Sequence, residues 1–307
     1  MRFAAIEAIY EAALKNQNIY FITGDLGHAY EEEFKQNLSK QYLNTGLSEQ
    51  NMIGVAAGLA LTGKKVFAYS IVPFVTMRGY EQIKTDICYQ NLDVNLIGIG
   101  GGFAYGKFGN THCSIEDIAV MRVLPNMKVL CPANPKDTKD LTRQIIERSG
   151  PSYIRIGRGK EPLPTTPFKV SFGKGHIVRK GTDISIFSCG TALIEAEKAA
   201  ETLERRGISV EVVHMHTVKP LDEKLIVEKV KKRKAIFTVE DHNIMGGLGG
   251  AVAEIISEHS TKKIVFKRFG VKDKYMKFIG DEDFMRNMHG YSAAKISRYI
   301  FNTLSQP

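Results

Sequence analysis

The first half of the chain alternates short runs, most of them mainly apolar and the one at 41–45 only weakly so, with segments in which apolar residues recur at helical spacing. The short runs are typical of buried strands, and they lie at residues 19–23, 41–45, 65–70, 94–99, 127–131 and 152–156. The helical segments occupy residues 4–15, 50–62, 75–90, a short stretch near 114, and 135–148. Alternating strands and helices favour a mainly parallel sheet that is covered by helices on both faces.

A second alternating unit fills the rest of the chain. Its expected strands are 184–188, 209–213, 235–240 and 263–267, and its expected helices are 191–206, 221–232, 247–258 and 291–304. Between the two units, residues 157–174 are rich in Gly, Pro, Thr and Lys, a composition typical of linkers. We predict an α/β protein of two domains, each a mainly parallel sheet flanked by helices, at residues 1–160 and 175–307 with a linker at 161–174.

The net charge of +9 on 307 residues raises the question of a nucleic-acid partner. Lys and Arg are spread widely, and the densest run, residues 231–234, ends an expected helix, where cations complement the helix dipole. No nucleic-acid-binding motif accompanies the charge. We therefore expect no nucleic-acid binding and relate the surplus to anionic substrates or an acidic partner chain.

The cysteines and the N-terminus bear on the cellular compartment. Four cysteines form no CxxC pair and no zinc spacing, so we expect free thiols and no metal ligands: Cys88, Cys113, Cys131 and Cys189. Met1-Arg2-Phe3 leads directly into an amphipathic helix, which is unlike a signal peptide, and no apolar run is long enough to span a bilayer. These features predict a cytoplasmic protein without a membrane partner.

One carboxylate stands at the start of a markedly apolar helix. The stretch Gly46-Leu47-Ser48-Glu49-Gln50-Asn51-Met52 leads into residues 53–60, which are small and apolar on every face and so predict a buried helix. One interpretation is structural: Ser48 caps the helix and Glu49 is a first-turn acid that favours the dipole. The alternative is that Glu49 is a functional carboxylate.

Several unusual segments fall at the carboxyl ends of expected parallel strands, where function gathers in α/β sheets. These are residues 24–28, 71–74, the glycine-rich loop 100–112, and the arginines Arg155 and Arg158. The loop has neither GxGxxG entering a helix nor GxxxxGK[ST], so nucleotide binding is not supported. Taken singly, His112 fits an ordinary loop histidine and Phe74 a core residue.

Ordered motifs nevertheless resemble one family. The Glu49 stretch, followed by Gly54, Ala56, Ala57 and Gly58, resembles the glutamate motif of thiamine-diphosphate enzymes of the transketolase superfamily. Further similar segments follow in the family's order: 78–83, the Gly-x-Thr-His loop 109–117, 125–129, 132–134, and Val239-Glu240-Asp241-His242 with Gly246-Gly247-Leu248-Gly249. The resemblance covers residues 2 to about 290.

The resemblance implies a role for each site residue. Glu49 would hydrogen-bond N1′ of the thiamine aminopyrimidine and favour the imino tautomer that removes the thiazolium proton. Phe74 would stack on the pyrimidine, with Ser48 and Arg78 as further cofactor contacts. For the substrate, the resemblance implies His112 as a proton donor or acceptor and three binding residues: Arg158, Arg2 and Phe108.

The chain also departs from the family pattern. It lacks the Gly-Asp-Gly segment that marks the diphosphate-binding domain, and it corresponds to the pyrimidine-binding and C-terminal domains only. We expect a separate N-terminal subunit to hold the diphosphate and Mg²⁺, in an α₂β₂ assembly in which this chain also self-associates. Phe108 stands where sugar-phosphate transketolases carry Asp, and Gly100 and Gly101 stand where they carry a further His. A modified sugar, or a donor or acceptor of different length, is therefore expected.

The leading interpretation is the C-terminal subunit of a transketolase-like enzyme that transfers a two-carbon ketol unit from a ketose to an aldose. One alternative keeps thiamine: a 2-oxoacid or acetoin dehydrogenase β subunit, or a deoxyxylulose-phosphate-synthase-like enzyme. The segment Ile154-Arg155-Ile156-Gly157-Arg158-Gly159 and the Thr111-His112 pair favour the transketolase and synthase side. A catalytically silent homologue is the third interpretation, and the presence of Glu49 argues against it.

Overall fold

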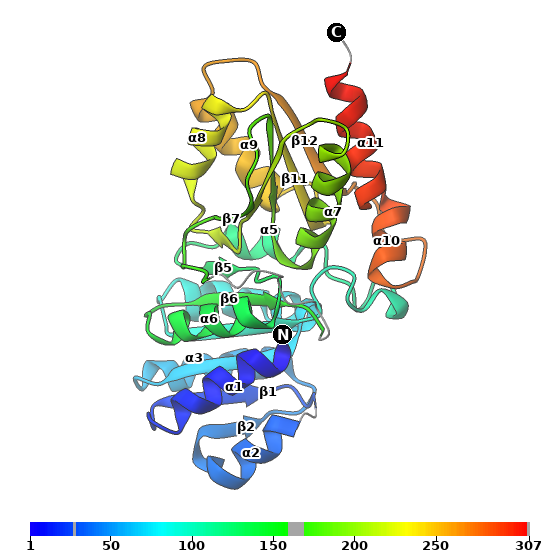
Figure 1. Ribbon diagram of the computed structural model, residues 1–307. Helices are drawn as coiled ribbons and strands as arrows, with labels where there is room; N and C mark the ends of the chain where they lie inside the picture. The colour runs from blue at the N-terminus through cyan, green and yellow to red at the C-terminus, as the bar shows by residue number, and fades with distance from the viewer. Residues whose placement is uncertain (27–28, 159–168, 306–307) are drawn as a thin grey trace.

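A computed structural model describes residues 1–26, 29–158 and 169–305, without the side chains of residues 29 and 30. Gly27 and His28 of the loop after the first strand lie outside the described residues, as does most of the predicted linker. The chain forms two α/β domains, one stacked on the other, with the N-terminus close to their junction and the C-terminus at the far end of the second domain (Figure 1).

The first sheet is parallel except at one edge. Its strands are β1 (Ile19–Thr23), β2 (Tyr42–Asn44), β3 (Lys65–Ile71), β4 (Val94–Ile99), β5 (Lys128–Leu130), β6 (Ser152–Ile156) and β10 (Thr217–Lys219), in the order β10-β5-β6-β4-β3-β1-β2. The edge strand β10 runs antiparallel to β5 and comes from the second half of the chain. Three residues are too few for a periodic pattern, so the sequence did not reveal this strand.

Helices cover both faces of the first sheet. One face carries α1 (Arg2–Ala13), α2 (Ala29–Asn37) and α6 (Pro135–Ile146), and the other carries α3 (Glu49–Leu61), α4 (Tyr80–Gln82) and α5 (Asp117–Arg122). The single helix expected at 75–90 is wrong, because α4 is flanked by π-helical segments at Phe74–Arg78 and Ile83–Cys88. Helix α2 was not predicted, since its sequence is mostly charged and polar.

The second sheet has the order β12-β11-β8-β9-β7, with only β7 antiparallel. Its strands are β7 (His176–Arg179), β8 (Ile184–Ser188), β9 (Val210–His214), β11 (Ala235–Asn243) and β12 (Val265–Val271). Its helices are α7 (Leu193–Glu204), α8 (Glu223–Lys232), α9 (Leu248–His259), α10 (Glu282–His289) and α11 (Ala293–Leu304). Two mainly parallel sheets flanked by helices confirm the predicted fold class.

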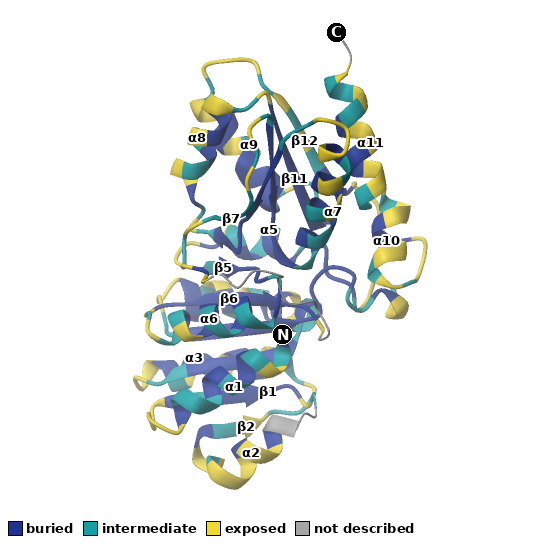
Figure 2. Ribbon diagram, viewed as in Figure 1, coloured by how far each residue is buried: buried dark blue, intermediate teal, exposed yellow. Residues whose placement is uncertain are grey.

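The two domains share their hydrophobic cores. Apolar side chains of α3 and α5 belong to one continuous core with those of α8 and α9. In return, Phe103, Cys113 and Ile115 from the glycine-rich loop of the first domain are buried among α7, α10 and α11 of the second. Buried residues therefore run from one sheet through the junction into the other (Figure 2). This packing fixes the loop that carries several predicted site residues.

A buried charge network fastens the same junction. Asp117 accepts a hydrogen bond from the Tyr153 hydroxyl and from Arg155 Nε, each at 2.7 Å. Arg155 Nη2 also donates to the backbone carbonyl of Asp241 in the second domain at 2.8 Å. Arg286 in turn binds the Asp241 carboxylate with Nε at 2.9 Å and Nη2 at 2.6 Å. The expectation that Arg155 lies on the rim beside Arg158 is wrong, because Arg155 is only 4% exposed.

The second-domain motif at 239–249 is structural within this chain. The Glu240 carboxylate is buried and accepts the backbone N–H groups of Leu248 and Gly249, each at 2.7 Å, so it caps α9. His242 Nε2 accepts the backbone N–H of Ala119 at the start of α5 at 3.3 Å, while Nδ1 donates to the Asn243 carbonyl at 2.7 Å. The motif thus orders one helix and ties β11 to the first domain.

A buried histidine at the junction predicts acid sensitivity. Burial, with the nearby His214 and His176, lowers the pKa of His216 to about 2. An unfolded chain takes up the proton near pH 6.5, so this contribution to stability is complete above that pH and is lost as the pH falls below it. Between pH 7 and pH 5 the free energy of unfolding should fall by about 2 kcal/mol through this residue. Urea titrations at the two pH values should show a smaller difference for His216→Asn than for the wild type, and equal differences would contradict the assignment.

Candidate functional site

The centre of the site is a carboxylate at the first residue of α3. Glu49 is 2% exposed, and its Oε1 accepts a hydrogen bond from the Ser70 hydroxyl at the end of β3 at 3.1 Å. A Cβ atom on Gly24, at the end of β1, would lie 3.7 Å from the same oxygen. The absence of a side chain there leaves the face of Glu49 open to a flat group.

Arg78 and Phe74 join Glu49 from the π-helical turn that follows β3. Arg78 Nη1 donates to Glu49 Oε2 at 2.7 Å, and its guanidinium lies 3.9 Å from the centroid of the Phe74 ring. The arginine side chain is half exposed whereas the carboxylate is buried. Residues 74 and 78 are four positions apart on this turn, so they lie on the same face of it.

An aromatic cluster extends the site into the glycine-rich loop. The His112 ring meets Phe74 edge-on, with centroids 5.3 Å apart, and lies 5.4 Å from the Phe108 ring. Tyr105 meets both Phe108 and His112 edge-on, at 5.9 Å and 6.3 Å. His112 Nδ1 lies 3.0 Å from the Thr111 hydroxyl. The cluster therefore links the Glu49 carboxylate to the loop after β4.

Two arginines complete the rim on the far side of Tyr105. The Arg158 guanidinium lies 5.0 Å from the Tyr105 ring centroid and 6.0 Å from that of Phe108. Burial raises the pKa of Tyr105, and the charges of Arg158 and Arg2 act in the opposite direction. Arg2 also has a buried Nε that finds no hydrogen-bond partner among the residues that the structure describes. The rim is thus positively charged.

Two expectations about α3 are wrong. Ser48 is the residue before the helix, but its hydroxyl donates to the Thr45 carbonyl at 2.7 Å and accepts no capping hydrogen bond. Helix α3 is also not buried on every face, since Gly54 and Gly58 are exposed and meet nothing within 4 Å, and Leu61 is 62% exposed. In a sequence pattern, small residues on an exposed face look the same as small residues of the core.

A segment of the second domain lies against the loop of the site. The Asn110 side chain exchanges two hydrogen bonds with the backbone of Met276, at 2.9 Å and 3.0 Å. Gly106 lies so close to Gly280 that an added Cβ would be 2.4 Å from the Gly280 carbonyl oxygen. These contacts hold the turn between β4 and α5 from outside, and sequence separation hid them from prediction.

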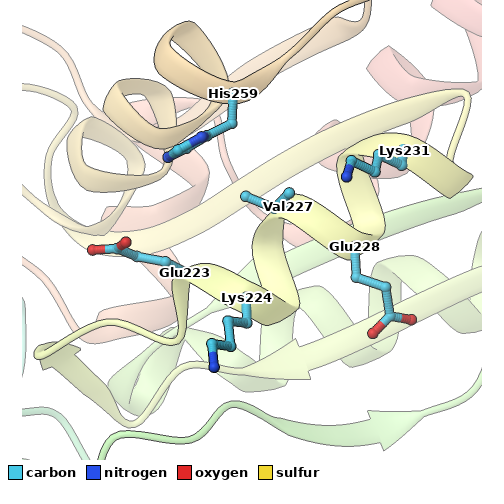
Figure 3. A pocket seen from close by; sticks show the side chains of 6 residues that line it. All are labelled: Glu223, Lys224, Val227, Glu228, Lys231 and His259. Atoms are coloured by element: carbon cyan, nitrogen blue, oxygen red, sulfur yellow. The ribbon is translucent and has the colours of Figure 1, made fainter.

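A surface groove between α8 and α9 is unrelated to this site. Five of its lining residues come from α8 and the sixth, His259, from the end of α9 (Figure 3). Glu228 forms an exposed ion pair with Lys232 at 3.0 Å, as expected for a solvated helix face. Among the described residues, no three His, Cys, Asp or Glu side chains could hold a metal ion together, and no helix could cross a membrane.

Two known protein families match this chain and identify the family to which it belongs. The transketolase pyrimidine-binding domain matches residues 1–162, and the transketolase C-terminal domain matches residues 173–296. The chain belongs to the transketolase family. It corresponds to the C-terminal part of a transketolase-like transferase, as the order of its motifs predicted.

Relatives and solved structures place it among divided members of this family. The putative transketolase C-terminal section of Methanocaldococcus jannaschii is 37% identical and covers 100% of this chain and 96% of its own length. An apulose-4-phosphate transketolase subunit of Actinobacillus succinogenes is 36% identical, with 86% and 85% covered. The 6-deoxy-6-sulfo-D-fructose transketolase subunit SqwH of Clostridium sp. is 33% identical, with 97% and 92% covered. A split-gene transketolase, solved as an inactive β4 tetramer, has a TM-score of 0.87 and 34% identity over 99% of this chain and 97% of that one.

The residues present fit the thiamine group on which this family depends. Glu49 offers a buried acceptor, Gly24 leaves its face open, and Phe74 supplies a half-buried ring beside it. Sequence reasoning found Glu49, Phe74, Arg78 and His112 through the family motifs. It did not single out Ser70, and it placed Gly24 and Tyr105 in candidate segments without giving either a role. Their shared signal is a place at the carboxyl end of a parallel strand, which is common to many residues without a role.

Proposed function

We propose that this chain is the C-terminal subunit of a thiamine-diphosphate-dependent transketolase that transfers a two-carbon ketol unit from a ketose donor to an aldose acceptor. The observation that carries the proposal is the buried Glu49 carboxylate, held by Arg78 and open toward Gly24, in a chain of the transketolase family. When bound, thiamine diphosphate supplies the carbanion stabilisation that ketol transfer needs.

The chain's own residues have separate tasks in this proposal. Glu49 accepts a hydrogen bond from the aminopyrimidine ring, with Arg78 and Ser70 fixing the orientation of its carboxylate. Phe74 packs on the ring and Arg78 holds Phe74 in place from its other side. Ser48 ends the loop that leads into α3. His112 moves a proton at the substrate, with the Thr111 hydroxyl close to its Nδ1.

The substrate class follows from the rim. Arg158 and Arg2 lie around Tyr105, and Phe108 presents an exposed ring at the same edge. Two guanidinium groups fit a terminal phosphate or sulfonate. Relatives are named for apulose 4-phosphate and for 6-deoxy-6-sulfo-D-fructose, which supports an anionic end and an unusual carbon skeleton. We therefore propose a modified ketose with a terminal anionic group.

The diphosphate and Mg²⁺ would be held mainly by a separate N-terminal subunit. Relatives that are named as a transketolase subunit and as a C-terminal section support this division of the enzyme. A related split-gene transketolase, solved as an inactive tetramer of β chains, supports self-association of this chain. The exposed face of α3, where Gly54 and Gly58 allow close approach, supports it as well. An α₂β₂ heterotetramer is the proposed active form.

The test of the proposal is reconstitution. The chain is purified alone and after co-expression with a candidate N-terminal subunit, and each preparation receives thiamine diphosphate, Mg²⁺ and a panel of ketose donors with an aldose acceptor. Ketol transfer should require both chains and fall to background without the partner. Full turnover by this chain alone would contradict the division of labour. Pyruvate with glyceraldehyde 3-phosphate, added to the same panel, tests the synthase alternative.

We propose further that the domain boundaries lie at 160 and 175, which limited proteolysis within residues 161–174 would test. A cytoplasmic location is also proposed. The four cysteines, all buried and without a disulfide, support a reducing compartment.

A further inference from the structure

We propose that the Tyr105 hydroxyl is a direct ligand of the substrate's terminal anionic group, in a subsite that it forms with Arg158 and Arg2. The proposal rests on the proposed function, because the substrate class comes from there. Tyr105 was not among the residues that the family resemblance assigned. The Tyr105 ring lies at the site because it packs against the backbone of Gly100.

Gly100 fixes the place of the Tyr105 ring. This glycine has a φ of +84°, in the left-handed region that favours glycine. A Cβ atom on it would lie 2.0 Å from Tyr105 Cε2 and 2.2 Å from Cδ2. The ring therefore lies against the glycine backbone, and a side chain at position 100 and the observed ring cannot coexist. The space that a side chain at position 100 would fill is thus occupied by Tyr105, five positions further along the loop.

The surroundings of the phenol are cationic. Arg158 stacks over the Tyr105 ring at 5.0 Å, and the charges of Arg158 and Arg2 both act on the phenol. Within the described part of the chain, the buried Arg2 Nε has no hydrogen-bond partner. Buried N–H groups are almost always satisfied, so an acceptor that arrives with the substrate accounts for this one. Two cations and one O–H donor then converge on the same anion.

The same ring also contacts the reacting end of the site. Tyr105 meets His112 edge-on at 6.3 Å, and His112 contacts Phe74 at 5.3 Å. A sugar whose anionic group lies at Tyr105 would extend along this aromatic cluster toward Glu49. Tyr105 therefore selects for a terminal anion and sets how far that anion lies from the ketol group.

The test is Tyr105→Phe in the assembled enzyme, which keeps the ring and removes only the hydroxyl. The KM for the phosphorylated or sulfonated ketose that the donor panel identifies should rise roughly 10- to 100-fold, the loss of one hydrogen bond to a charged group, while kcat stays within about twofold. The KM for erythrulose, an uncharged donor, should not change. The inhibition constant of inorganic phosphate should rise together with the KM of the anionic donor. Tyr299→Phe, on α11, is the matched control and should behave as the wild type.

A Gly100→Ala variant provides an independent test, because its methyl group displaces the Tyr105 ring. The KM for the anionic donor should rise as it does for Tyr105→Phe, and the KM for erythrulose should not change. Equal KM values for Tyr105→Phe and the wild type with both donors would overturn the proposal. If the wild-type assembly transfers no ketol unit from any donor, the proposed function fails instead. Calorimetric titration of that assembly with inorganic phosphate then tests separately whether Tyr105 binds the anion. The Tyr105→Phe variant should bind phosphate at least tenfold more weakly than the wild type. Equal binding by the two would overturn the subsite.

Discussion

A Glu49→Gln variant, assembled with its partner subunit, should lose ketol transfer by a factor of about 10²–10⁴ while the complex still forms. Glutamine keeps the shape of the side chain at the start of α3 and its contact with Ser70. It removes the negative charge that Arg78 binds at 2.7 Å and that would hold the protonated ring nitrogen. Turnover is measured by coupled assay, and assembly by size-exclusion chromatography with light scattering.

The matched control for this experiment is Glu81→Gln. Glu81 is exposed on α4, close in sequence to Arg78, and among the described residues its carboxylate forms hydrogen bonds with two neighbouring side chains of the same segment: Gln82 and Thr85. Turnover of the control should match that of the wild type. If Glu49→Gln kept wild-type turnover as well, Glu49 would be the ordinary first-turn acid that its position permits, and a catalytically silent chain would become the better interpretation.

An Arg286→Met variant should lower the free energy of unfolding by about 3–5 kcal/mol. The Asp241 carboxylate is buried, and burial alone would raise its pKa. The charge and hydrogen bonds of Arg286, together with the charge of Arg155 and the hydrogen bond from Thr191, outweigh burial and lower that pKa instead. Without Arg286 the carboxylate keeps only the hydroxyls of Tyr291 and Thr191, both at 3.1 Å. Urea denaturation measures the loss.

Two comparisons separate the buried pair from a general effect of removing a charge. Lys232→Met breaks an exposed pair with Glu228 and should cost at most about 0.5 kcal/mol. The double variant Arg286→Met/Asp241→Asn should recover part of the stability, because position 241 then holds no unpaired buried charge, while the buried Glu195 carboxylate still lacks its Arg286 partner. A loss of under about 1 kcal/mol for Arg286→Met would show that the pair contributes little to the junction.

The strands that the sequence predicted well are buried ones that consist of a nearly continuous apolar run. Strands β1, β4, β6 and β8 lie at or within one residue of the expected ranges because both of their faces are covered and almost every position must be apolar. The elements it missed are short or polar. Helix α2 buries little beyond Phe34, and β10 has three residues whose partner, β5, is more than eighty positions away.

The site residues also divide into those that local sequence motifs predicted and those whose contacts depend on the tertiary structure. The ordered motifs determined that Glu49 begins a helix, that Phe74 and Arg78 follow β3, and that His112 follows a glycine-rich loop, because each role depends on local spacing. Only the tertiary structure decided that Arg78 pairs with Glu49, that Arg155 turns inward to Asp117 while Arg158 stays on the rim, and that Tyr105 occupies the space over Gly100. Those contacts join residues from separate strands and loops, and no periodicity in one chain encodes which loops will meet.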